Sequence, residues 1–434
     1  MKLRVILISV LLALAGCSLP PGMDQYFGGQ VTPSRYPDFA VTPDSTPVTT
    51  AEPTPIESWD AIEIWLPPQF DPAGSSAAGQ VLQKRLNAFQ LETGVRVRVR
   101  IKSEAGTAGL LQSVSLTKAA APQNLPALVL LSRQDMETAA LKGYLVSLDG
   151  RSLLIDDPDW YPFAQQMAFI QGSQFGLPMA GDALLTVYRP AQVGTRPASW
   201  EAVSGGSDRI VFPAADLSAL VTVAAYLSAG GKLQDAQGRL QVEREPLIKV
   251  LEVYNTAARS GLFPANIVQY QTDANSWQAY TDNSADIAIT WASRYLAQLP
   301  ADSVAVTVPG IEGSVVSLGT AWMLTLTDPL VTRQPVSVAL AEYLCDPTFQ
   351  AELTAAAGYL PTRPSALDLW KDQSLRATMN SIIQTTHALP SNDVIFSIGP
   401  LFQDAVLQVI RQQSTPIESA DEVLERLQPP EVNT

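Results

Sequence analysis

The chain has 434 residues, enough for two or three domains, and its 46% hydrophobic content supports ordinary cores, which excludes wholesale disorder. Its 28 basic and 42 acidic residues give a net charge of −14, which repels phosphate backbones and argues against nucleic-acid binding. Cys17, Cys345 and His387 are the whole complement of cysteine and histidine, too few for a Cys/His metal cluster or a familiar catalytic dyad.

The N-terminus has the features of a secretory signal. Two basic residues, Lys2 and Arg4, precede the apolar stretch 5–14, which is short for a membrane span. Leu14-Ala15-Gly16-Cys17 resembles the bacterial lipobox. That resemblance implies that residues 1–16 are a lipoprotein signal peptide, that Cys17 is lipidated, and that the protein is anchored to the outer face of the cell membrane. A plain signal peptide or a single-span anchor is the alternative.

Residues 17–57 differ sharply in composition from the rest. Between Pro20 and Pro55 there are eight prolines and six threonines in 36 residues, with almost no apolar periodicity. Such a composition predicts an extended tether. At about 3.1 Å per residue its reach is on the order of 100 Å, so the folded part can stand away from a membrane.

The first folded elements predict α/β architecture. Residues 61–66 read as a strand, and apolar residues at helical spacing over 81–93 predict a helix that ends at Gly94. Residues 95–101 alternate aliphatic residues with arginine, which favours a strand with a solvated face near a sheet edge over an anion site. A helix near 110–118 and an apolar strand at 127–131 follow.

The later elements are also well delimited. Leu247, Val250, Leu251 and Tyr254 line one face of a helix that ends by Gly261. Residues 286–291 and 318–324 read as strands, and the pattern after Pro335 is helical nearly to the end. Cys345 lies in an apolar run and is expected to be a small buried side chain.

Short motifs recur along residues 60–428 in a fixed order: Ile62-Glu63-Ile64-Trp65, Phe89-Gln90-Leu91-Glu92-Thr93-Gly94-Val95, Pro126-Ala127-Leu128-Val129-Leu130, Ala140-Leu141-Lys142-Gly143-Tyr144-Leu145, Phe175-Gly176-Leu177-Pro178, Pro197-Ala198-Ser199-Trp200 and Gly358-Tyr359-Leu360-Pro361-Thr362-Arg363. The set resembles the extracellular solute-binding proteins of carbohydrate ABC importers, the maltose-binding-like class (family 1). Each motif alone is weak, and the agreement in order carries the resemblance.

The resemblance implies a two-lobed, periplasmic-binding-protein-like (type II) α/β fold with a ligand cleft between the lobes. Chain segments then divide as follows: lobe 1, 58–180 and 320–346; lobe 2, 181–319 and 347–428; and a tail, 429–434. The lobes would be joined by crossing segments near 176–188, near 315–326 and around Pro347. In the family, a ligand is held while the lobes close by hinge motion.

Aromatic residues are the first candidates for the cleft, because sugar-binding sites stack the apolar faces of sugars on aromatic rings. Trp65 closes the first strand, Trp291 ends a later one, and Trp322 lies in an expected crossing strand. Core packing is the alternative for each tryptophan. The resemblance also implies a stacking residue near the C-terminus, and it leaves Phe396 and Phe402 as alternatives.

Polar candidates come from the ends of strands. Arg133 and Gln134 follow the buried strand at 127–131 and should reach the cleft if the sheet order is that of the family. Asp182 follows the Gly-Leu-Pro segment, where the family often places a polar contact, and a solvated turn is the alternative.

The resulting hypothesis is a lipid-anchored, extracytoplasmic binding protein that delivers a small solute, most simply a carbohydrate, to an ABC permease. It predicts a monomer without cofactor, metal or enzymatic activity. A tethered sensor or scaffold that kept the fold is the main alternative. A surface enzyme is less favoured, because Ser115-Leu116-Thr117-Lys118 fits an S-x-x-K pattern whose S-D-N and K-T-G partner motifs do not occur in the sequence.

Overall fold

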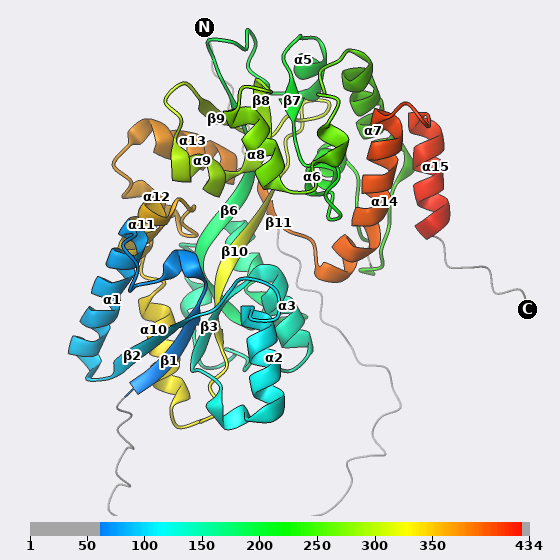
Figure 1. The fold of residues 1–434 in the computed structure, drawn as a ribbon. Helices are drawn as coiled ribbons and strands as arrows, with labels where there is room; N and C mark the ends of the chain where they lie inside the picture. Colours follow the sequence, from blue (N-terminus) through cyan, green and yellow to red (C-terminus); the bar gives the residue numbers. More distant parts are fainter. Residues whose placement is uncertain (1–60, 236, 428–434) are drawn as a thin grey trace, which may run out of the picture. The chain divides into compact units, whose positions relative to one another are not determined.

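The computed structural model describes residues 61–235 and 237–427, so the predicted signal peptide, Cys17, the tether and the tail at 429–434 lie outside the described residues. A mixed nine-stranded sheet runs through the folded part, with the order β2-β1-β3-β10-β6-β8-β7, and β11 and β9 pair with β10 and β6. Helices pack along the sheet in two groups, one around β1–β3 and one around β7–β9 (Figure 1). The fold is the expected two-lobed α/β arrangement.

Lobe 1 contains the first three strands, with β1 parallel to both neighbours. Arginines of the edge strand β2 are exposed, which confirms the predicted solvated edge. The first helix ends at Gly94, whose φ of 76° is the left-handed conformation that favours glycine. The elements of lobe 1 are β1 (Ala61–Leu66), α1 (Ala77–Thr93), β2 (Arg96–Ile101), α2 (Leu110–Ala120), β3 (Leu128–Ser132), α3 (Arg133–Leu141), α4 (Pro162–Met167) and α10 (Gln334–Tyr343).

Lobe 2 is built around β8, which pairs in parallel with β7 and antiparallel with β6. The amphipathic helix predicted before Gly261 is α7, and it packs against α6, α14 and α15. The elements of lobe 2 are α5 (Trp200–Ser204), β7 (Ile210–Val211), α6 (Leu220–Ser228), α7 (Arg244–Arg259), α8 (Asp273–Thr281), β8 (Ile287–Trp291), α9 (Ala292–Gln298), β9 (Val304–Val306), α13 (Gln373–Ile383), α14 (Asn392–Ile410) and α15 (Pro416–Leu427).

Two long strands, β6 (Gly176–Tyr188) and β10 (Ser317–Leu326), connect the lobes. They pair antiparallel, and the first half of β6 lies in the lobe 1 sheet while the second half pairs with β8 and β9. The pairing shifts register between Trp322 and Met323. Both predicted crossings near 176–188 and 315–326 are therefore present as continuous strands.

The third connection differs from the expectation of a crossing around Pro347. Pro347 begins α11 (Pro347–Ala357), which packs against α1 of lobe 1 although residues from 347 onward were expected in lobe 2. The chain reaches the crossing strands later, where Leu360 and Gly181 exchange backbone hydrogen bonds of 2.7 and 2.8 Å. Helix α12 (Pro364–Asp368) then leads to α13, which packs on β9 and β6.

The remaining elements are short. They are β4 (Phe169–Ile170) and β5 (Ser173–Gln174), which form a ribbon, β11 (Thr386–Ala388), and the 3-10 helices η1 (Pro68–Phe70), η2 (Pro122–Asn124), η3 (Leu154–Asp156) and η4 (Ile267–Gln269). Cys345 is fully buried, which confirms its prediction, and burial raises the pKa of its thiol.

Helix α14 is the one helix in the described ranges that is long and apolar enough to cross a membrane. Half of its most apolar window is buried inside the fold, and the helix packs against α6, α7 and α15. Its hydrophobic face is thus used by lobe 2, as in a core helix of a globular domain.

Strand β11 and helix α4 pack so closely on the crossing strand β10 that Gly319 has no room for a side chain. A Cβ there would lie 2.5 Å from Cγ2 of Thr386 and 2.9 Å from Cδ2 of Phe163. We expect Gly319→Ala to lower the free energy of unfolding by about 1–3 kcal/mol, measured by urea denaturation. Gly194→Ala is the control, because nothing lies within 4 Å of a Cβ at Gly194. Equal stability of the two variants would contradict the close packing.

Candidate functional site

Two adjoining cavities lie where the crossing strands pass between the lobes. The first, here named the aromatic cavity, has a volume of about 190 Å³ and is lined by Ser132, Asp182, Trp291, Thr320, Ala321, Trp322 and Tyr359. The second, the polar cavity, measures about 500 Å³ and is lined by Gln69, Glu104, Thr272, Asp273, Ala274, Trp291, Ser293, Arg294, Ala297, Gln298, Ala357 and Tyr359. Trp291 and Tyr359 belong to both, so the cavities form one candidate cleft.

Both lobes and the crossings supply the lining. Lobe 1 contributes Ser132 from the end of β3 and Gln69 from η1, which follows β1. Lobe 2 contributes Trp291 from the end of β8. Asp182 and Trp322 come from the crossing strands themselves. The carboxyl ends of β1, β3 and β8 therefore converge here, as expected for a ligand site in an open α/β sheet.

Asp182 is the most deeply placed charged residue of the cleft, with 8% of its surface exposed. Its Oδ1 accepts hydrogen bonds from the backbone N–H groups of Ala183 at 2.9 Å and Ser293 at 3.0 Å. Burial raises the pKa of Asp182 to about 7, against the opposing effect of these hydrogen bonds. Within residues 61–235 and 237–427, no lysine or arginine forms an ion pair with it.

Phe70 packs against two of the aromatic rings that line the aromatic cavity, those of Trp322 and Tyr359. It is fully buried, stacks on Tyr359 at 5.6 Å between centroids, and meets Trp322 edge-on at 6.2 Å. Burial raises the pKa of Tyr359 to about 12, so its hydroxyl stays protonated at neutral pH. Trp291, Trp322 and Tyr359 are half-buried, which leaves part of each ring open to the cavity.

Asp273 positions the lobe 2 wall. Its Oδ1 accepts hydrogen bonds from the Thr290 hydroxyl at 2.6 Å and the Trp291 backbone N–H at 3.3 Å. Its Oδ2 is paired with Nε of Arg294 at 2.9 Å. This carboxylate thus holds the end of β8 and neutralises the arginine that lines the polar cavity.

Three of the predicted site residues, Asp182, Trp291 and Trp322, come together in the aromatic cavity. Their role as ligand contacts remains a prediction. Trp65 does not line either cavity, because it is 2% exposed and donates from Nε1 to Glu63 at 2.6 Å within its own strand. Trp65 therefore has almost no accessible surface for the ligand contact that is predicted for it.

The other predicted residues also lie outside the cavity linings. Phe402 is fully buried against Tyr226, and Phe396 is 69% exposed on the same helix. Arg133 pairs with Glu137 at 2.7 Å, and the backbone oxygen of Gln134 accepts a hydrogen bond from Asn392 at 2.8 Å. The ion pair of Arg133 lies within α3, and the hydrogen bond of Gln134 holds the start of α14, so neither contact faces the cleft.

Sequence reasoning missed several lining residues, notably Gln69, Asp273 and Tyr359. Tyr359 belongs to the motif Gly358 to Arg363, and that motif is the signal in the sequence that could have identified Tyr359 as a site residue. Its position beside Asp182 follows from the pairing of Leu360 with Gly181, which no local pattern reveals. Gln69 lies in the short helix η1 of a proline-rich segment, and its Nε2 atom is buried without a hydrogen-bond partner.

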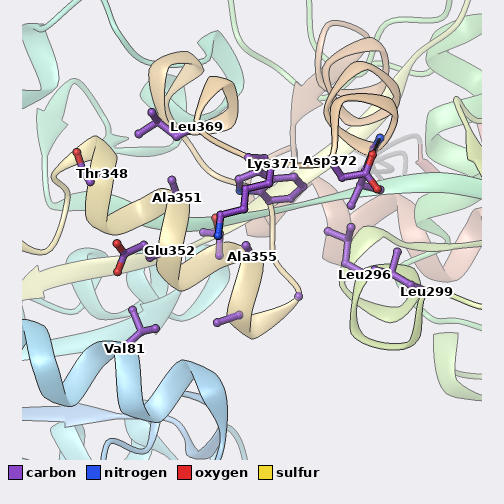
Figure 2. Close-up of a pocket in the computed structure, with 15 residues that line it drawn as sticks. Val81, Leu296, Leu299, Thr348, Ala351, Glu352, Ala355, Leu369, Lys371 and Asp372 are labelled. Carbon is purple, nitrogen blue, oxygen red and sulfur yellow. Dashed lines mark hydrogen bonds between the residues drawn. The ribbon is translucent and has the colours of Figure 1, made fainter.

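A larger cavity of about 660 Å³ lies next to the cleft, between α1, α9, α11 and the α12–α13 connection (Figure 2). Aliphatic side chains, among them Val81, Leu296 and Leu299, line it together with the polar side chains of Thr348, Glu352, Lys371 and Asp372. Most of its surface is apolar, whereas most of the surface of the polar cavity is polar and better suited to a hydroxylated solute. The polar and aromatic cavities are therefore the better site for such a ligand.

No group of three or more metal-ligating side chains is found in the part of the chain that the structure describes. The chemistry of the cleft is that of reversible binding: aromatic faces for apolar surfaces, and carboxylates, amides and a hydroxyl for hydrogen bonds.

This two-lobed fold with a cleft at the strand crossings is that of a binding protein. The sequence matches the profile of a family described as bacterial extracellular solute-binding protein over residues 84–378. The chain belongs to that family. Its members are extracellular binding proteins rather than enzymes, which places the chain outside the cytoplasm.

Solved structures agree on the fold. The maltose-bound T. maritima MalE3 is 15% identical, with 85% of this chain and 98% of that chain covered and a TM-score of 0.65. The sugar-binding MalE of Xanthomonas citri is 19% identical, with 85% and 96% covered and a TM-score of 0.68. A solute-binding protein of Agrobacterium radiobacter in complex with ribitol is 17% identical, with 86% and 99% covered and a TM-score of 0.61. Comparison with curated proteins gives no significant match.

Stability should depend on pH through Asp182. Its folded pKa of about 7 lies above the ordinary value of 3.8, so its stabilising contribution is complete below about pH 4 and is lost as pH rises through 7. Asp182→Asn removes this loss. We therefore compare the free energy of unfolding of the variant with that of the parent at two pH values, by urea denaturation without ligand. The difference, variant minus parent, should be on the order of 2 kcal/mol larger at pH 8 than at pH 5. The same gain at both pH values would contradict the raised pKa.

Proposed function

We propose that the protein is the lipid-anchored receptor of an ABC importer, which captures a small hydroxylated solute, most simply a carbohydrate or polyol, and delivers it to the permease. The observation that carries this proposal is the cleft lined by both lobes, in which the rings of Trp291, Trp322 and Tyr359 lie beside Asp182. Aromatic rings beside a carboxylate suit sugars, whose C–H faces stack while their hydroxyls donate hydrogen bonds.

The structural neighbours support a ligand of this class. Two proteins of the same fold are solved with maltose and with ribitol, a disaccharide and a polyol. The polar cavity adds hydrogen-bonding groups from Gln69, Glu104 and Gln298. A solute that reaches from the aromatic to the polar cavity would contact both lobes.

Capture would use the strand crossings as the hinge. Asp182 and Trp322 lie on β6 and β10, whereas Trp291 moves with lobe 2 and Ser132 with lobe 1. A ligand that contacts all four residues binds the closed arrangement better than the open one and shifts the population toward it. The permease would recognise that closed state. Energy must come from a separate ATPase, because the sequence contains no G-x-x-x-x-G-K phosphate-binding motif.

Thermal shift with the full chain in detergent tests the ligand class. The panel comprises mono- and oligosaccharides, polyols and amino acids. A solute at about 100 times its Kd should stabilise the fold by about 2.7 kcal/mol, which raises the melting temperature measurably. Stabilisation by amino acids alone would overturn the carbohydrate assignment. A cooperative melt with no response to any solute would favour the alternative, a tethered sensor or scaffold.

Trp291→Ala tests the site. Removal of a ring shared by both cavities should weaken binding of the best solute by about tenfold or more, measured by isothermal titration calorimetry. Phe396→Ala is the matched aromatic control, because Phe396 is 69% exposed and lines neither cavity. Unchanged affinity in Trp291→Ala, or equal losses in both variants, would contradict the assignment of the cleft.

Cys17→Ser tests the anchor. If Cys17 carries the lipid, the variant should move from the membrane fraction to the soluble fraction and lose incorporation of radiolabelled palmitate, because the acyl chains provide the membrane affinity. Cys345→Ser is the matched control, since Cys345 is fully buried in the fold. Retention of label in Cys17→Ser would overturn the lipoprotein assignment.

A further inference from the structure

The aromatic cavity combines features that a neutral sugar does not fully explain. It is small, about 190 Å³, and three of its seven lining residues carry large aromatic rings. The only ionisable carboxylate in the lining, Asp182, is 8% exposed. Its Oδ1 is satisfied by two backbone N–H groups, yet no lysine or arginine in the described ranges pairs with it.

A buried carboxylate without a counter-ion is unusual, because desolvation disfavours its charged form. The other two buried acids of the described residues, Glu137 and Asp328, do have cationic partners, Arg133 and Arg333. Asp273, which lines the polar cavity, is also paired, with Arg294. The residues around Asp182 supply no cation for it. Asp273 and Glu104 are acids as well, and the nearby Arg294 is already paired with Asp273.

The missing partner has a natural place in the cavity. Trp291, Trp322 and Tyr359 border the same space as Asp182, and aromatic faces attract cations through the negative potential above the ring. A cage of aromatic rings with one carboxylate is the arrangement that recognises ammonium groups. A ligand cation would supply the positively charged partner that Asp182 does not have among the described residues.

We propose that the aromatic cavity binds a positively charged amine, so that the captured solute carries a protonated or quaternary ammonium group held between Trp291, Trp322, Tyr359 and Asp182. This inference rests on the proposed solute-binding function and narrows its ligand class. The amine can belong to an amino sugar, whose hydroxyls would extend into the polar cavity, or to a small quaternary ammonium compound. The two sources share the same chemistry at Asp182.

Isothermal titration calorimetry with the full chain compares matched ligands. Glucosamine carries the charge, N-acetylglucosamine and glucose are its neutral counterparts, and choline is the quaternary ammonium probe. We expect at least one charged ligand to bind tenfold or more tightly than glucose and N-acetylglucosamine. Glucosamine as the tighter cation would indicate the amino-sugar source, and choline alone would indicate the quaternary ammonium source and overturn the carbohydrate assignment.

The remaining outcomes separate the two proposals. Neutral sugars that bind as well as the charged ligands would overturn the amine inference and leave the proposed carbohydrate function intact. Absence of binding by every solute would overturn both.

Asp182→Asn removes the charge and keeps the shape of the side chain. We expect the variant to lose at least tenfold in affinity for the preferred cation and to lose its preference over the neutral counterpart, while its thermal melt remains cooperative. An unchanged preference in the folded variant would overturn the role of Asp182.

Binding of choline by the parent protein gives a second measurement that needs no variant, because the charge of choline is constant with pH. Affinity should rise as pH increases from 5.5 toward 8, approaching tenfold per unit below the pKa of Asp182, since the cation binds its ionised form. The other charged groups that line the cleft are Asp273, Glu104 and Arg294. A flat profile would overturn the proposal for choline.

Discussion

The antiparallel pairing of β6 with β10 is the constraint on which the rest of the structure depends. These strands make one sheet continuous through both lobes, so the two halves of the fold share backbone hydrogen bonds at their junction. Close packing of β11 and α4 leaves no room for a side chain at Gly319 of β10, and the register shift lies beside Trp322, which lines the aromatic cavity. The position of Asp182 on the partner strand then brings its carboxylate to the same space.

Residues that line the cleft are held by groups that a ligand does not touch. Phe70 is buried under Trp322 and Tyr359, and Asp273 fixes the backbone of Trp291. These contacts hold the rings in place before a ligand arrives. Less side-chain freedom is then lost on binding, which lowers the entropic cost. Lobe motion can change the separation of these walls while leaving each wall intact, because their supports lie within single lobes or on the crossings.

Local sequence patterns predict the elements whose periodicity and end signals lie in one segment, such as α1 with Gly94 and the exposed arginines of β2. The same patterns cannot tell Trp65 from Trp322, since both are tryptophans in strands. Trp65 is 2% exposed and donates to Glu63 of its own strand, whereas Trp322 is half-buried beside the register shift of the crossing and lines the aromatic cavity. Tyr359 enters the site through a pairing across the chain, between Leu360 and Gly181. The family resemblance supplied the lobes, and tertiary pairing alone decides which side chains face the cleft.

The negative charge of the protein would act on a cationic solute in two ways, at long range and at direct contact. The whole chain carries −14, and a field of that sign raises the local concentration of cations and repels anions. Salt screens this long-range attraction within about 8–10 Å, so it affects encounter more than affinity. Asp182 acts at contact, in a space that is largely shielded from water, where a carboxylate without an internal cation interacts strongly with a ligand charge. Selectivity for an amine would therefore reside in the aromatic cavity, while the acidic surface would speed its capture.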